Sequence, residues 1–254
     1  MMPDARLAPI FKDLVVAIKQ LVEKHQITPE EYRAAVGFLS EAGEAGEIPL
    51  LFDVFLEALV VDVNSRRSRG TPVNVLGPYY LEGAPFIERG RLVSEDERGD
   101  RLVVTGIVRD VEGDPISGAL LDFWQADAQG RYSGFDPGPA EMNLRGRLRS
   151  QRDGSYQLHT VRPSAYTIPH DGPTGRILLA LGQHPWRPAH IHLKASHEGY
   201  KPIITQVYLA DSEYLDSDAA NAVRDDLIRP VTPTGSGYSI DFDVLLEPEP
   251  TPAG

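Results

Sequence analysis

Two histidines stand two residues apart in the stretch RPAHIHLKASHEGY, at positions 190 and 192. The stretch has the pattern of a β-strand, in which residues i and i+2 project from the same face. His190 and His192 would then point the same way, while Ile191 and Leu193 would point into a core. Neutral imidazole is the commonest metal ligand in proteins, so the pair suggests a metal site. Two exposed or hydrogen-bonded histidines are the simpler alternative.

Two tyrosines have unusual surroundings. Tyr132 follows a glycine at an expected strand end in ADAQGRYSGFDP, and Tyr166 lies in VRPSAYTIP between two prolines that stiffen the loop. Either tyrosine alone is more simply explained as an aromatic residue that packs a loop.

Composition excludes several classes of function. The chain has 254 residues, a net charge of −12 and no cysteine. The acidity argues against nucleic acid or an anionic membrane as a main partner, because both require basic patches. The lack of cysteine removes disulfides, Cys-ligated zinc, iron–sulfur clusters and thiol nucleophiles. No stretch resembles a signal peptide or a transmembrane helix, so a cytoplasmic protein is expected.

Common catalytic motifs are missing from the sequence. It contains no GxSxG elbow, no Walker A or Rossmann glycine pattern and no HExxH zinc motif. A ferrous site of two histidines and one carboxylate is poorly supported, since Glu198 is six residues beyond His192. Zinc bound by His190, His192 and a third histidine stays possible. The candidates for that third ligand are His159, His170, His184 and His197.

The elements that must position these residues divide into two regions. Residues 1–69 show a helical period of apolar residues, and Thr28, Pro29 and Glu31 predict a helix start with a capping box. A third helix would carry Leu51, Val54, Phe55, Ala58 and Leu59. Residues 70–254 contain short β-rich runs separated by turns, which predict an antiparallel β-sandwich or barrel. RILLALG counts among these runs, and DSDAANAVRDDLI is expected to form a short helix.

The combined pattern resembles the intradiol ring-cleaving dioxygenases. The resemblance lies in LGPYYLEGAP, FWQADAQGRYSGF, RGRLRSQRDGSYQLHTVRPSAYTIPHDGPTG and LGQHPWRPAHIHLKASHEGYKPIITQVYLADSEYLDSDA. These stretches cover most of residues 70–225 in the family's order. A helical N-terminal region is typical of the catechol 1,2-dioxygenase branch, and it implies a mainly β fold with an N-terminal helical region that forms a homodimer.

The resemblance implies non-heme ferric iron bound by Tyr132, Tyr166, His190 and His192. Ferric iron favours anionic oxygen donors, and a bound cation can deprotonate a phenol whose ordinary pKa is about 10. The donor types therefore agree with the implied metal.

The implied reaction is the cleavage of catechol by O2 to a cis,cis-muconate. By analogy, Tyr166 would act as both ligand and base, and Arg187 would offer a fixed positive charge where the ring becomes carbanion-like. Gln206 would lie near the iron.

The likeness to chlorocatechol 1,2-dioxygenases implies a pocket wall that contacts a chloro- or methyl-substituted catechol. Its expected members are Leu50, Asp53, Val54, Gly77, Tyr79 and Ala220. The family also implies a phospholipid held between the N-terminal helices. Three alternatives remain open: a hydroxyquinol 1,2-dioxygenase, a zinc-dependent hydrolase, and a β-sandwich that only binds a carbohydrate or a protein.

Overall fold

The computed structural model describes residues 4–92 and 97–249. The chain divides into two compact units, Met1–Ile48 and Pro49–Gly254. None of the helices in the described residues is both long enough and apolar enough to span a membrane.

The first unit consists of two helices, α1 (Asp4–His25) and α2 (Pro29–Glu44). The predicted capping box at the start of α2 is confirmed: Thr28 Oγ1 accepts the backbone N–H of Glu31 at 3.2 Å, and the Glu31 carboxylate accepts that of Thr28 at 2.9 Å. These two bonds satisfy amides that have no partner inside the helix.

A helical stretch of three parts follows, and nearly all of it belongs to the second unit. These parts are α3 (Ile48–Phe52), a π-helical turn η1 (Asp53–Glu57) and α4 (Ala58–Ser65). A 3₁₀ turn η2 follows at Glu88–Gly90. The single predicted third helix is therefore interrupted, because the π turn inserts a residue into the helical hydrogen-bond ladder.

One five-stranded sheet is arranged around the long strand β1 (Arg101–Asp110). β4 (Ser155–Val161) pairs antiparallel with one edge of β1. β11 (Gly237–Asp241) and then β12 (Val244–Leu246) pair parallel with its other edge, and β10 (Thr232–Thr234) lies beyond β11. The parallel pairs differ from a purely antiparallel sandwich, and they arise because the chain returns to β1 from the far end of the sequence.

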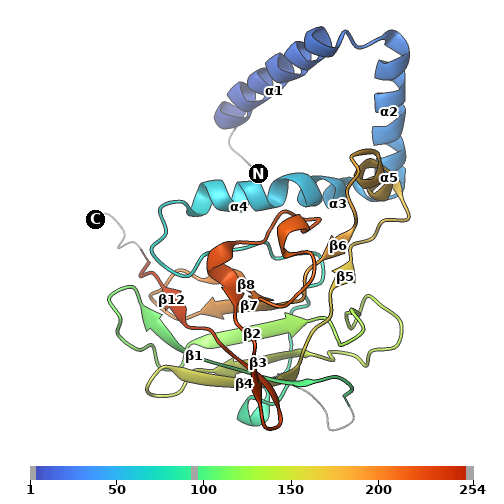
Figure 1. The fold of residues 1–254 in the computed structure, drawn as a ribbon. Coiled ribbons are helices and arrows are strands. Elements are labelled where there is room, and N and C mark those ends of the chain that lie inside the picture. The colour runs from blue at the N-terminus through green and yellow to red at the C-terminus, as the bar shows by residue number, and fades with distance from the viewer. Residues whose placement is uncertain (1–3, 93–96, 250–254) are drawn as a thin grey trace. The chain divides into compact units, whose positions relative to one another are not determined.

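The other five-stranded sheet has the order β3 (Arg145–Arg149), β2 (Leu120–Gln125), β7 (His190–Ser196), β8 (Ile203–Leu209) and β9 (Ile228–Arg229). β5 (Tyr166–Thr167) and β6 (Trp186–Arg187) form a separate two-stranded sheet. The two large sheets lie as two layers (Figure 1), and one hydrophobic core takes residues from both. The sandwich predicted for this region is confirmed.

Two local predictions are wrong. RILLALG lies mostly in a helix, α5 (Pro173–Ala180), because Pro173 at the first helical position presets the backbone angle that a helix needs. DSDAANAVRDDLI has only the 3₁₀ turns η3 (Leu215–Ser217) and η4 (Asp225–Leu227). Asp218 prevents a longer helix there, since its carboxylate accepts the backbone N–H groups of Ala220 and Ala222.

Candidate active site

Strand β7 presents the two histidines on the sheet face opposite the core. Ile191 and Leu193 are fully buried in the core between the sheets, as the strand alternation predicts. His192 lies opposite Trp124 of β2, and the two rings stack at 4.6 Å with an interplanar angle of 10°. The rigid indole therefore fixes the plane of the imidazole.

Burial keeps both imidazoles neutral. His190 Nδ1 donates to the Pro188 carbonyl at 2.7 Å, so the lone pair of the neutral ring sits on Nε2. Burial and then the charge of Arg187 lower the pKa of His190 to about 3, and burial lowers that of His192 well below its ordinary value. The Nε2 atoms of the two rings lie 3.1 Å apart, within hydrogen-bonding distance of each other.

Both tyrosines lie beside the histidines, although they come from separate elements. Tyr132 follows a tight turn at Gly130, which has a φ of +79°. Tyr166 is the first residue of β5, and it lies opposite Arg187 of β6 in the antiparallel pairing of these two strands. The ring of Tyr166 lies 5.2 Å from that of Tyr132 and 5.6 Å from that of His190.

Burial of the two phenols opposes their ionisation and leaves one hydroxyl without a hydrogen-bond partner. Burial raises the pKa of Tyr132 and of Tyr166, so neither ionises at neutral pH without a compensating positive charge. Among the described residues, the buried Tyr132 hydroxyl has no hydrogen-bond partner, and neither does Nδ1 of His192. A buried polar group without a partner is costly, and a bound cation would remove that cost for the tyrosine.

No third histidine completes a zinc site. Within the described residues, no group of three or more His, Cys, Asp or Glu side chains is placed to hold a metal ion. His159 lies on β4 in the other sheet, His170 bonds the Ile168 carbonyl, and His184 contacts Tyr214. His197, the fourth candidate, contacts the carbonyl of Glu198. The described residues therefore give no support to the three-histidine zinc alternative.

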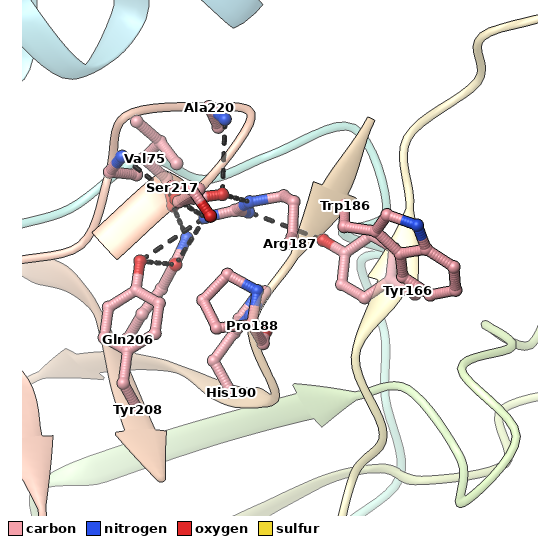
Figure 2. Close-up of polar contacts among 12 residues, drawn as sticks. Val75, Tyr166, Trp186, Arg187, Pro188, His190, Gln206, Tyr208, Ser217 and Ala220 are labelled. Carbon is pink, nitrogen blue, oxygen red and sulfur yellow. Dashed lines mark hydrogen bonds and ion pairs between the residues drawn. The ribbon is translucent and has the colours of Figure 1, made fainter. Parts of the chain in front are cut away.

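Arg187 lies at the centre of a buried polar network (Figure 2). Its guanidinium forms a two-point ion pair with Asp218, with distances of 2.9 Å from Nε and 3.1 Å from Nη2. Nη1 lies 3.4 Å from the Tyr166 hydroxyl, and Nη2 also reaches Gln206 Oε1 at 3.1 Å. The arginine that the sequence singled out is thus both ion-paired and directed at Tyr166.

Gln206 is held on the neighbouring strand β8. Its side-chain amide donates to the Val75 carbonyl at 2.9 Å, and its oxygen accepts the Tyr208 hydroxyl at 2.5 Å. Gln206 lies opposite His192 in the pairing of β7 with β8, and Tyr208 lies opposite His190. Side chains of cross-strand partners share a face, so β8 supports both histidines and Arg187.

The sequence interpretation missed Asp218, Tyr208 and Trp124. A buried arginine requires an acidic partner, which was a signal for Asp218. Asp218 is 31 residues from Arg187, and no sequence motif with that separation predicts an ion pair. Tyr208 and Trp124 could have been found by extending the strand alternation of β7 to its two neighbours.

Two of the expected pocket residues contact the tyrosine–histidine cluster directly. A methyl group added to Gly77 would lie 3.6 Å from His192 Cε1, so the backbone of Gly77 faces that ring. Tyr79 stacks on Tyr132 at 4.5 Å and meets Tyr166 edge-on at 5.8 Å.

The other expected pocket residues have different surroundings. Val54 belongs to a small apolar cluster with Ile168, Leu178 and Ala219, and Leu50 packs against it. Ala220 donates its N–H to Asp218. Asp53 starts the π turn η1, and its charge, after burial, raises the pKa of Glu57.

A polar pocket of about 370 Å³ reaches this region. Tyr79, Tyr166, Trp186 and Tyr214 contribute its aromatic lining. Of the six expected wall residues, only Tyr79 lines it. Tyr166 therefore lines the pocket, whereas His190 and His192 are buried and do not line it.

Comparison with known proteins identifies relatives of the whole chain. Residues 4–71 match the family described as "Catechol dioxygenase N terminus", and residues 75–248 match the one described as "Dioxygenase". The chain is 39% identical to a chlorocatechol 1,2-dioxygenase of Rhodococcus opacus, with 97% of this chain and 99% of that protein covered. It is 37% identical to a 6-chlorohydroxyquinol 1,2-dioxygenase of Cupriavidus pinatubonensis, with 97% and 92% covered.

Solved structures give the same result. The 3-chlorocatechol 1,2-dioxygenase of Rhodococcus opacus superimposes with a TM-score of 0.90 at 35% identity, over 97% of this chain and all of that one. A hydroxyquinol 1,2-dioxygenase of Pseudomonas putida superimposes with a TM-score of 0.91 at 34% identity, over 98% and 94%. The similarity therefore includes both the helices and the sandwich.

Proposed function

The chain belongs to the intradiol ring-cleaving dioxygenases, and from this membership we propose that it cleaves catechol or a substituted catechol with O2 to give a cis,cis-muconate. The observation that carries this function is the convergence of two buried phenols and two neutral imidazoles beside Arg187. The Tyr132 hydroxyl, which has no hydrogen-bond partner among the described residues, is the part of this cluster that most requires a cation.

Tyr132, Tyr166, His190 and His192 would hold non-heme ferric iron. Two oxygen donors that become anionic on binding and two neutral nitrogen donors suit a small, highly charged cation. Trp124 and the Pro188 carbonyl orient the imidazoles from behind. Such supporting contacts typically fix ring orientation and metal affinity.

The bound iron would supply Lewis-acid activation of the catecholate toward O2. Tyr166 would accept a catechol proton, because Arg187 Nη1 at 3.4 Å favours its phenolate form. Arg187 would also stabilise negative charge as it develops on the ring. Gln206 supports this role by holding Nη2 of the guanidinium.

Chlorocatechols are the favoured substrates within the catechols. Three of the relatives above 34% identity are named chlorocatechol 1,2-dioxygenases. Leu50, Val54, Gly77, Tyr79 and Ala220, with Asp53, are proposed to form the wall that contacts ring substituents. Hydroxyquinol is the second candidate, because two relatives and one structural neighbour are named for hydroxyquinols.

The region 1–69 is proposed to form the dimer contact and to hold a phospholipid. Large apolar side chains of α1 are exposed in the single chain, among them Ile10, Phe11, Leu14, Ile18 and Leu21. Light scattering and lipid extraction of the purified protein test the two assignments. The expected cytoplasmic location would be tested by cell fractionation.

The first experiment is a visible absorption spectrum with iron analysis, before and after anaerobic addition of catechol. We expect a tyrosinate-to-iron charge-transfer band that shifts when catechol binds, and then turnover of chlorinated, methylated and hydroxylated catechols. His190→Ala and His192→Ala should each lose iron, whereas His197→Ala, at a half-buried histidine just beyond the same strand, should keep it. Retained iron and activity in both site variants would refute the ligand assignment.

A further inference from the structure

We propose that Asp218 is a positioning residue that holds Arg187 in its working orientation and couples it to the substrate-contacting loop. The proposal rests on the proposed function, because it assigns a role in that reaction. The hydrogen bonds of the Asp218 carboxylate go to Arg187 and to two backbone amides, not to the four proposed iron ligands, so it would act through other residues.

The Asp218 carboxylate is saturated by four donors. Its oxygens accept Nε and Nη2 of Arg187 at 2.9 and 3.1 Å, and the N–H groups of Ala220 and Ala222 at 3.2 and 3.0 Å. The paired side chains of Arg187 and Asp218 are only 4% and 2% exposed. A carboxylate bound in this way cannot turn without breaking hydrogen bonds that water cannot replace.

This geometry leaves the guanidinium a single orientation. The guanidinium is planar and rigid, so a carboxylate on its Nε–Nη2 edge also sets the direction of Nη1. In the structure, Nη1 then faces the Tyr166 hydroxyl at 3.4 Å. Gln206 and Tyr208 contact Nη2 at 3.1 and 3.3 Å and oppose a tilt of the plane.

The same carboxylate shapes the loop that carries Ala219 and Ala220. Ala219 donates its N–H to the Trp186 carbonyl at 3.0 Å and packs in the apolar cluster with Val54. Asn221 has a φ of +50°, a conformation that the bonds from Asp218 to its two neighbours help to maintain. One side chain thus connects the orientation of Arg187 to the proposed substrate wall.

Asp218→Asn tests this role, since it keeps the size of the side chain but replaces an acceptor oxygen and the charge. We expect kcat for catechol to fall about 100-fold, the loss typical of a small misplacement of a catalytic group, while iron content and the charge-transfer band are retained. The ratio of kcat/KM for 4-chlorocatechol to kcat/KM for catechol should also change by at least about 3-fold. This threshold is modest, because a single apolar contact in a pocket can change such a ratio by about 10-fold or more. Asp211→Asn is the control, because both carboxylate oxygens of Asp211 accept Nη2 of Arg162 in an ion pair that is partly exposed to solvent.

A double-mutant cycle separates positioning from general structural support. In an Arg187→Gln background, Asp218→Asn should lower kcat by less than about 3-fold, because groups that act as a unit are not additive. Arg187→Gln alone should lower kcat and leave the substrate ratio unchanged, since the loop keeps its carboxylate.

Three outcomes would overturn the proposal. They are wild-type kcat in Asp218→Asn, an equal loss in both backgrounds, and an unchanged substrate ratio. If Asp218→Asn does not fold, Asp218→Glu keeps the charge but moves the carboxylate by one methylene, and wild-type kcat in that variant overturns the proposal too. A wild-type protein without iron or catechol turnover would instead refute the proposed function, and the role of Asp218 would fall with it.

Discussion

Gly77 shows how closely the backbone approaches a proposed ligand. Its φ is +70°, and an added methyl group would contact His192. Gly77→Ala should therefore lower stability by about 1–2 kcal/mol through backbone strain and also raise KM for catechol. Thermal unfolding and steady-state kinetics measure the two effects.

Gly83 provides a control for the strain alone. Its φ is +84°, and an added methyl group there would meet nothing within 4 Å. Gly83→Ala should lose stability to a similar extent and keep the KM of the natural chain. Equal KM values in both variants would show that Gly77 does not face the substrate region.

At the residue scale, the sequence predicted what local periodicity encodes. The shared face of His190 and His192 follows from two-residue alternation, and the structure has it. The pairing of Arg187 with Asp218 does not follow, because a buried ion pair between distant segments leaves no periodic trace. The orphaned Tyr132 hydroxyl also required coordinates, since burial of one atom depends on the packing of several elements.

Helix α2 offers a test at the scale of one element. Thr28→Ala removes the hydroxyl that accepts the Glu31 amide, and such a loss costs about 1 kcal/mol. A lower helical content or an earlier loss of helical circular dichroism on heating is expected. Ser40→Ala is the control on the same helix, because its hydroxyl bonds only the carbonyl of Val36, four residues earlier, and caps nothing. Equal melting of both variants would contradict a role for the cap.

Elements were predictable where one signal dominated. The capping box fixed the start of α2, and alternation identified β7. RILLALG misled because a short apolar run suits a strand and a helix equally, and Pro173 decided the matter. DSDAANAVRDDLI misled because its helix-forming alanines compete with a tertiary contact of Asp218, which composition does not reveal.

Iron should stabilise the whole second unit. Its four proposed ligands come from the loop after β2, from β5 and from β7, so binding would connect three separate segments. At free iron 100-fold above its dissociation constant, the free energy of unfolding should rise by about 2.7 kcal/mol. Calorimetry of the iron-free and reconstituted protein measures this difference.

Magnesium is the control metal ion for that experiment. It prefers carboxylates and water as ligands, so it should leave the melting temperature unchanged. A Tyr132→Phe/His192→Ala double variant should lose the response to iron. An identical melting temperature with and without iron in the natural chain would argue against a shared site.

At the scale of the whole molecule, the β-rich runs and turn signals predicted a β-sandwich or barrel with helices before it, and the family resemblance favoured the sandwich. The parallel pairs of β1 with β11 and β12 were not predictable, because pairing partners more than 100 residues apart are chosen by the packing of both sheets. The interrupted helix at Asp53–Glu57 was also beyond the sequence, since a π turn has no distinctive composition.

The position of β1 has a consequence for synthesis on the ribosome. β1 is synthesised well before its partners and can pair with β4 once Ser155–Val161 has been made, yet its other edge is completed only by Gly237–Asp241 and Val244–Leu246. Until then the nascent sheet presents an unpaired edge, which is a template for association with other chains. Chains whose translation stalls before residue 237 should therefore aggregate. Synthesis of residues 237–246 would remove this tendency, because it completes the second edge of β1.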